Sequence, residues 1–114
     1  MMRPFLYLYS MYCIVYRFTL CQPSDESRAR FVKTWSGITD YLKAECGALG
    51  SRLHLGEDGS FFAYAQWPSL AVFEASSEHE PKLDFVEMRL DWAELCEPSE
   101  LIFAGEMVAD LSIN

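Results

Sequence analysis

Residues 59–69 read GSFFAYAQWPS, and this stretch decides the fold. Side chains alternate between the two faces of a strand. One face of this strand carries two small and two aromatic residues: Phe61, Ala63, Ala65 and Trp67. The other face is also largely apolar: Phe62, Tyr64 and Gln66. A strand with one face in water alternates apolar and polar residues, so both faces of this strand need cover.

The same stretch closes a predicted β-hairpin, which has two strands and a loop: residues 48–55, 60–67 and 56–59. The loop reads GEDG, and its glycines permit the positive φ angles of a tight turn. The number of loop residues decides which face carries Arg52 and His54. An even-numbered loop places them on the face of Trp67, whereas a three-residue loop places them on the opposite face.

Local patterns predict the elements on either side of the hairpin. Residues 12–20 are β-branched and aromatic and form a first strand. A helix then begins after Ser24 or Asp25 and ends at Gly47. Its apolar stripe has helical spacing: Phe31, Trp35, Ile38 and Leu42.

After the hairpin, Pro68 ends the strand because it has no amide hydrogen, and Ser69 caps a short helix that begins LAVF. Pro81 is expected as the first residue of another helix. The apolar stripe expected for that helix is Leu83, Val86, Leu90 and Ala93. A last strand is expected over residues 101–111.

The resulting order is strand, helix, strand, strand, helix, strand, with the second helical region split in two. This order predicts an α+β fold, a ferredoxin-like sandwich whose antiparallel four-stranded sheet carries both helical regions on one face. The helices cover the Ala63 and Trp67 face of the strand. A second copy of the chain, packed sheet to sheet, is expected to cover the other face, so we predict a homodimer.

Chain length, net charge and cysteine spacing limit the possible domain number, partners and location. A chain of 114 residues fits one domain, which we place at residues 11–114, with residues 1–10 as an N-terminal extension that is absent if translation starts at Met11. A net charge of −8 argues against nucleic acid as a partner. The four cysteines show no metal-ligand spacing, and we expect free thiols in the cytoplasm, no signal peptide and no membrane segment.

Several motifs together resemble the antibiotic biosynthesis monooxygenase domain family. They are residues 50–54 (GSRLH), Asp58-Gly59, residues 63–69 (AYAQWPS), residues 14–18 (IVYRF), Trp35 and residues 108–111 (VADL). The resemblance spans residues 11–111 and implies a dimeric α/β barrel with a pocket between sheet and helices in each subunit. Members oxidise polyketide aromatics or quinols with molecular oxygen and no cofactor, or degrade heme.

Cofactor-independent oxidation requires a base, a cation beside the substrate anion and a dry apolar pocket. His54 is the candidate base, Arg52 the candidate cation and Trp67 the candidate stacking surface. The expected substrate pocket is lined by Trp35, Ala63, Ala65 and Phe73. The plain alternatives are an Arg52 ion pair, for example with Glu106, an exposed His54 and a Trp67 that only fills the core.

Two functions remain open at this point. The first is a small monooxygenase that oxidises a phenolic or quinol compound without cofactor or metal; the second is a catalytically silent dimeric barrel that binds a small apolar ligand or a partner. Heme degradation is a minor alternative, since Trp67 and His79 resemble family heme-site residues. That site also requires an asparagine, and the only asparagine here is the terminal Asn114.

Overall fold

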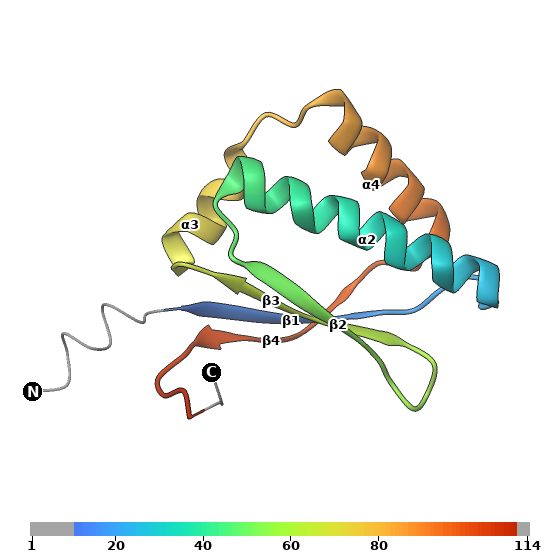
Figure 1. Cartoon of the computed structure of the whole chain (residues 1–114), viewed down its shortest axis with the longest axis horizontal. Helices are drawn as coiled ribbons and strands as arrows, with labels where there is room; N and C mark the ends of the chain where they lie inside the picture. The colour runs from blue at the N-terminus through green and yellow to red at the C-terminus, as the bar shows by residue number, and fades with distance from the viewer. Residues whose placement is uncertain (1–10, 112–114) are drawn as a thin grey trace, which may run out of the picture.

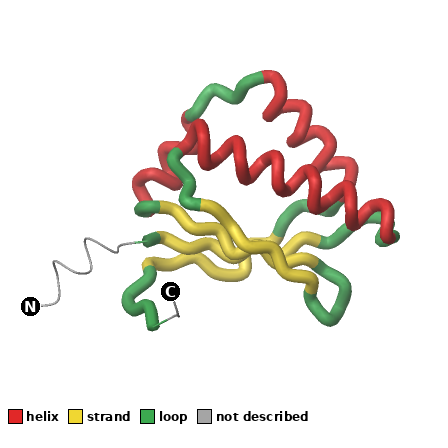
Figure 2. The backbone as a smooth tube through the Cα atoms, in the orientation of Figure 1, coloured by secondary structure: helices red, strands yellow, loops and turns green. Residues whose placement is uncertain are grey.

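The computed structural model describes residues 11–111, which form one sheet with every helix on the same face (Figure 1). The strands are β1 (Tyr12–Phe18), β2 (Gly50–Leu55), β3 (Phe61–Trp67) and β4 (Glu100–Glu106). The helical elements are α2 (Asp25–Cys46), α3 (Leu70–Ala75), the 3-10 turn η1 (Ser76–Glu78) and α4 (Leu83–Leu95). All strand pairs are antiparallel in the order β2-β3-β1-β4, which confirms the ferredoxin-like α+β sandwich. Figure 2 shows the two layers.

The structure tests the two ends of the predicted domain only in part. Residues 1–10, expected as an extension, and residues 112–114 lie outside the described residues. The last strand ends at Glu106, five residues before the predicted end. In the described part of the chain, no helix has both the length and the apolar character needed to cross a membrane.

Helix α2 has the predicted start and stop signals. The Ser24 hydroxyl accepts a hydrogen bond from the Ser27 amide at 3.0 Å, and the Ser27 hydroxyl accepts one from the Ser24 amide at 2.9 Å. These two bonds form a capping box, with serine in place of the usual Glu or Gln at the third position. At the other end Gly47 has a φ of 80°, a left-handed conformation that other residues adopt only with strain.

The hairpin loop differs from both lengths considered above. Leu55 pairs with Phe61, so the loop is five residues, 56–60. This odd length places Arg52 opposite Tyr64 and His54 opposite Phe62, on the face away from the helices. The expectation of an even-numbered loop is therefore wrong, and Arg52 and His54 do not share the face of Trp67. The sequence shows the glycines but not that the loop closes at Ser60, whose carbonyl accepts from the Gly56 amide at 2.7 Å.

The loop is stabilised by the Asp58 carboxylate. It accepts hydrogen bonds from the Ser60 hydroxyl at 2.5 Å and the Ser60 amide at 3.0 Å, and it pairs with the Arg17 guanidinium at 2.6 Å. The Ser60 hydroxyl, then the Ser60 amide and then the Arg17 charge lower the pKa of Asp58 below its usual value. The charged form of Asp58 thus favours the folded state.

This shift makes stability depend on pH. Because the folded-state pKa is lowered, the contribution of Asp58 is complete above its unfolded pKa of about 3.9 and is lost as pH falls through the folded pKa. Asp58→Asn is therefore expected to lower the urea midpoint at pH 7 and to bring it closer to wild type at pH 3. An equal gap between the two proteins at both pH values would contradict this account.

The centre of the core lies between the sheet and the helices α2 and α4. Phe31 of α2 is fully buried, and its ring stacks on Phe61 at 4.6 Å and on Trp92 at 4.5 Å between ring centroids. The ring of Phe18 meets the edge of Trp92 at 4.9 Å. One residue of each neighbouring element thus contributes an aromatic ring to the same cluster, which ties both helices to the sheet.

Helix α4 packs through a different stripe from the one predicted. Leu83 and Leu90 are 74% and 63% exposed, whereas Phe85 is buried and Trp92 is half-buried. The helix begins at Leu83 with Lys82 at the N-cap, so Pro81 lies just before the helix rather than at its first position. Apolar residues occur around most of this helix, and the aromatic pair faces inward because it buries more area than the leucine pair.

Helix α4 contacts α2 at a glycine. A Cβ atom placed on Gly37 would lie 2.6 Å from the Met88 sulfur. Gly37 therefore leaves room for the flexible end of the Met88 side chain, which would have to move for a larger residue.

The second face of the sheet has no helix over it (Figure 1). As predicted, Phe62 and Tyr64 lie on this open face, where Tyr64 pairs across the ladder with Val15. Val15 also pairs with Phe103 of the neighbouring edge strand β4, and Phe103 is 53% exposed. The Tyr64 hydroxyl donates to the Cys13 sulfur at 3.1 Å. The open face therefore carries aromatic side chains next to the polar Arg52 and His54.

Candidate functional site

A cavity of about 420 Å³ lies between the helix-facing side of the sheet and the helices α2 and α4. A volume of this size is typical of small-molecule sites. Four of the predicted site residues line it: Trp35, Ala63, Ala65 and Trp67. Tyr16, Phe18, Phe85 and Trp92 complete its aromatic wall. The two alanines of β3 leave the space, because larger side chains at these positions would fill it.

Phe73 is the one predicted pocket residue that does not line the cavity. Its ring meets the edge of Trp67 at 5.4 Å and stacks on Tyr12 at 6.1 Å between centroids. Phe73 therefore fixes the orientation of the Trp67 indole from behind. Trp67 is only 4% exposed and also borders the cavity, so it belongs both to the core and to the site wall.

The cavity has few polar groups, and they come from several elements: Tyr16, Thr39, Ser51, Arg89 and Ser99. Burial, and secondarily the neighbouring Tyr12, raises the pKa of Tyr16, so its hydroxyl is protonated at neutral pH and can donate a hydrogen bond. The Arg89 guanidinium lies over the Phe85 ring, 5.7 Å from its centroid. Arg89 is the only cation among the described residues that line the cavity.

Sequence reasoning missed Tyr16 and Arg89. Tyr16 pairs with Ala63 in the ladder, so its side chain shares the face of the alanines, but this register is known only once β1 is paired with β3. Arg89 lies four residues after Phe85 and three before Trp92. That spacing places a cation on the same stripe as the two aromatics, a signal that was visible only after the inward stripe of α4 was known.

Ser51 is the least satisfied polar group of the site. Its hydroxyl is buried and has no hydrogen-bond partner among the described residues. A buried hydroxyl without a partner costs free energy, so a ligand that bonds to it gains more than it would from an exposed serine. Ser51 pairs with Ala65 on the helix-facing side of β2, at the edge of the cavity.

Ser51→Ala is expected to raise the free energy of unfolding of the ligand-free protein by about 1 kcal/mol, because it removes an unsatisfied buried group. The same change is expected to weaken binding of a hydroxylated aromatic ligand. Chemical denaturation measures the first effect and quenching of tryptophan fluorescence the second. A loss of stability greater than about 1 kcal/mol would show that the hydroxyl is hydrogen-bonded in the folded protein.

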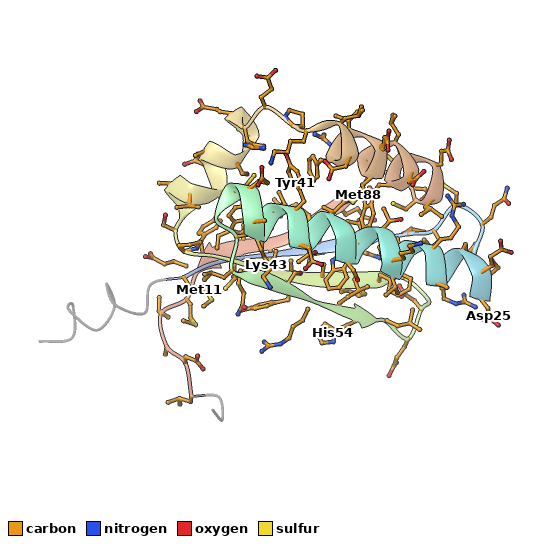
Figure 3. All side chains as sticks on the ribbon, turned by 45° about the horizontal axis from the view of Figure 1, so that its top comes forward. Met11, Asp25, Tyr41, Lys43, His54 and Met88 are labelled. Carbon is orange, nitrogen blue, oxygen red and sulfur yellow. The ribbon has the colours of Figure 1, made fainter. Side chains whose placement is uncertain are left out.

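Arg52 and His54 are not brought together with Trp67. Both side chains lie on the open face of the sheet, and in Figure 3 His54 projects from β2 away from the helices. The cavity lining in the described chain contains no histidine and no carboxylate. Arg52 makes no ion pair within residues 11–111 of one chain, so a pair with Glu106 across the same sheet is not formed, and a pair across a dimer stays a prediction.

His79 has a structural partner instead of a place in the cavity. Its Nε2 lies 2.7 Å from the Tyr41 hydroxyl, which also accepts a hydrogen bond from the Lys82 amide at 3.1 Å. The Tyr41 hydroxyl is therefore hydrogen-bonded to both His79 and Lys82, and it holds the loop between η1 and α4 against α2. His79 is thereby attached to the buried Tyr41, and its Nε2 is already in a hydrogen bond.

Solved structures with the same arrangement include oxygenases and proteins of unknown function. SnoaB, a cofactor-independent oxygenase from Streptomyces nogalater, is 18% identical, with a TM-score of 0.64 over 91% of this chain and 97% of its own. The monooxygenase of ActVA-Orf6 from Streptomyces coelicolor, in complex with the ligand nanaomycin D, is 20% identical with a TM-score of 0.62 over 90% of each chain. A putative antibiotic biosynthesis monooxygenase from Nitrosomonas europaea is 16% identical, with a TM-score of 0.64 over 86% and 90%.

The chain has the antibiotic biosynthesis monooxygenase fold. The resemblance deduced from residues 11–111 is therefore confirmed at the level of the fold. A dimeric protein of ferredoxin-like fold from Bacteroides fragilis is similar too, at 14% identity and a TM-score of 0.59 over 85% of this chain and 94% of its own. No family model matches the sequence, and no curated protein does.

Proposed function

We propose that the chain is a monooxygenase that oxidises a planar phenolic or quinol compound with molecular oxygen, without a cofactor. The cavity supports this proposal best: three tryptophans and a tyrosine surround a space that contains one cation and few polar groups. Aromatic walls bind planar ligands by stacking, and Arg89 provides a positive charge at the cavity for an anion. The similar oxygenases share this fold.

In the proposed reaction, the bound phenol or enol loses a proton and the resulting anion gives an electron to oxygen. Arg89 stabilises the anion, and the protonated Tyr16 hydroxyl donates a hydrogen bond to its oxygen. Trp35 and Trp67 hold the rings in the plane that this contact requires. The residues of this chain thus act by orientation and by charge.

The proton acceptor in this proposal is solvent at the cavity mouth. The described lining residues provide no imidazole or carboxylate as a base, and His54 lies on the other face of the sheet. Arg89 lowers the pKa of a bound phenol, so the substrate ionises more readily in the cavity than in water. In this proposal, the positive charge of Arg89 promotes loss of the substrate proton, the role that sequence analysis gave to His54.

A catalytically silent dimeric barrel that binds a small apolar ligand is the second candidate. The lack of a base among the described lining residues favours it, because an aromatic cavity alone is sufficient for binding. Oxygen consumption separates the two candidates, and ligand-induced stabilisation alone supports the second.

The test measures oxygen uptake with a panel of anthrones and quinols. Under the first candidate, Trp67→Phe lowers the uptake rate and His54→Ala leaves it unchanged, because only Trp67 lines the cavity. No uptake with any compound, together with a raised melting temperature in the presence of one of them, would reject the oxygenase and favour the binding protein.

We also propose that the protein is a homodimer whose two sheets pack through their open faces. Phe103 of β4 supports this arrangement, since it pairs with Val15 on the open face and is 53% exposed. Exposed apolar side chains that lie together on one face often mark a protein–protein interface. The cytoplasm is the proposed location, since all four cysteines are free thiols, as expected in a reducing compartment.

Light scattering is expected to give twice the 13.1 kDa chain mass at micromolar concentration. Phe103→Glu is expected to halve the mass, because it places a charge in the open face. Leu83→Glu is the control, since Leu83 is 74% exposed on α4, on the helix side of the molecule. A wild-type protein that remains at the monomer mass would contradict the proposal.

A further inference from the structure

We propose that the outer face of helix α4 is a docking surface for a positively charged amphipathic helix of another protein. The surface consists of an exposed apolar stripe with a row of carboxylates along one side of it. Its apolar residues, which we call the α4 stripe, are Leu83, Val86, Leu90 and Ala93. None of these four lines the cavity, so the inference goes beyond the proposed oxidation and does not depend on it.

The α4 stripe is an apolar face that the fold of one chain does not bury. Leu83 is 74% exposed, Leu90 63% and Val86 37%. At 3.6 residues per turn, the four side chains of the stripe lie within about 80° of one another around the helix axis. Exposed apolar side chains that are aligned in this way are typical of a surface that binds another protein.

The other sides of α4 already have partners. The ring of Trp92 stacks on Phe31 in the core, and the Met88 sulfur lies beside Gly37 of α2. Met88 is roughly opposite to the stripe around the helix axis. In Figure 1 no helix or strand of the described chain lies on the outer side of α4. The stripe therefore faces away from both the sheet and α2.

The spacing of the stripe is that of a seam between two helices. Its steps of three, four and three residues match the a and d positions of two heptads. A helix with the same apolar spacing packs against such a seam, with each side chain of one helix between side chains of the other. The 13 residues of α4 provide a short seam, which suits a reversible contact.

The acidic side chains beside the stripe determine the charge of the partner. In the heptad that begins at Leu83, Glu87 and Glu94 take the e positions, which flank the seam and meet charged residues of a partner helix. Asp84 and Asp91 lie beside them, and all four carboxylates are exposed. The ion pairs within residues 11–111 include none of these four. A partner helix with lysine or arginine beside its seam therefore gains ion pairs along α4.

A second copy of this chain fits the stripe less well than a basic helix does. Within α4 there are four carboxylates and one cation, Arg89, so two α4 helices side by side would bring two negative surfaces together. Like charges opposed across an interface cost free energy. The proposed homodimer uses the open face of the sheet, on the side away from the helices, so it leaves the stripe exposed.

The experiment measures binding of a fluorescein-labelled peptide to the full-length protein by fluorescence anisotropy at low ionic strength. The peptide repeats the heptad Leu-Ala-Ala-Leu-Lys-Gln-Lys three times, and its lysines beside the seam prevent it from pairing with itself. A scrambled peptide has the same composition and charge without the apolar spacing. Wild type is expected to bind the heptad peptide about tenfold more tightly than the scrambled peptide.

Leu90→Lys is expected to weaken binding of the heptad peptide about tenfold, because it places a charge in the seam. Lysine favours the helix and Leu90 is exposed, so the fold is expected to survive, which circular dichroism checks. Leu55→Lys is the matched control, since Leu55 is 60% exposed on β2 and receives the same charge away from α4. It is expected to bind the heptad peptide as wild type does.

A second pair of variants tests the carboxylates. Glu87→Gln/Glu94→Gln is expected to weaken binding of the heptad peptide about fivefold, the effect of losing two exposed ion pairs. Glu57→Gln/Glu74→Gln removes two exposed carboxylates outside α4 and is expected to leave binding unchanged. Equal loss in both double variants would overturn the proposal, because attraction to the net charge of the chain would then explain the binding.

Three further results would overturn the proposal. They are equal binding of the two peptides to wild type, unchanged binding of the heptad peptide to Leu90→Lys, and a mass by light scattering that Leu90→Lys lowers. The last result would show that a second copy covers the stripe. The oxidation proposal would stand in each case, because the stripe does not line the cavity.

Discussion

Replacement of Arg89 by glutamine is expected to lower the rate of substrate oxidation about a hundredfold, the lower end of the effect of removing one group that stabilises an oxyanion. Arg89 is the only cation of the described cavity lining, so no neighbouring side chain replaces its charge. Glutamine keeps a similar length and can still donate hydrogen bonds. The expected loss therefore reports the charge, and it is measured as oxygen uptake at saturating substrate.

The fold is expected to survive this change. The Arg89 guanidinium lies over the Phe85 ring of the same helix. Cation–π contacts of this kind contribute about 0.5–1 kcal/mol to stability at exposed sites. Arg30→Gln on α2 is the matched control, since it removes an exposed arginine that does not line the cavity. An Arg89→Gln protein with the wild-type rate would show that the anion is stabilised elsewhere.

Phe31→Ala is expected to lower the free energy of unfolding by about 3–5 kcal/mol, the usual cost of deleting a buried aromatic ring. Phe31 is fully buried and stacks on both Phe61 and Trp92, so it joins β3 to α4 through α2. A domain of this size has a total of only about 5–15 kcal/mol, so the change removes a large part of it. Urea denaturation followed by circular dichroism measures the loss.

Val32→Ala serves as the control for this variant. Val32 is the next residue of the same helix and is 41% exposed, so its truncation removes little buried area, and alanine favours the helix. The expected change is within about 0.5 kcal/mol. The core assignment would be contradicted if the two variants lost the same stability, or if Phe31→Ala lost less than about 1 kcal/mol.

The parts of the fold with strong local signals were predictable from sequence. Helix α2 has a serine N-cap, a four-three-four apolar stripe and a terminal glycine, and all three features hold in the structure. The face assignment of β3 was also predictable, because alternation along one strand requires no knowledge of its neighbours. Trp67, Ala63 and Ala65 were placed toward the helices for this reason, and they line the cavity.

The parts that depend on register were not predictable. One residue of loop length moved Arg52 and His54 to the opposite face, since side chains alternate with period two. Helix α4 has two competing apolar stripes, and packing against the rings of Phe31 and Phe18 selects the one that contains Trp92. Arg89 lines the site because of the stripe that α4 turns inward, and Tyr16 lines it because β1 pairs with β3. Local sequence patterns indicate neither of these arrangements.

The central claim is that the cavity of this chain binds a planar phenolic compound and inserts oxygen into it without a cofactor. The most direct test supplies labelled oxygen, ¹⁸O₂, to chelator-treated protein with an anthrone, whose CH₂ group becomes a carbonyl while the second oxygen atom leaves as water. The account predicts one labelled atom in each quinone formed, one oxygen molecule consumed per quinone, and a rate above buffer that Arg89→Gln lowers. A rate equal to that of buffer with every anthrone and quinol tested would contradict it.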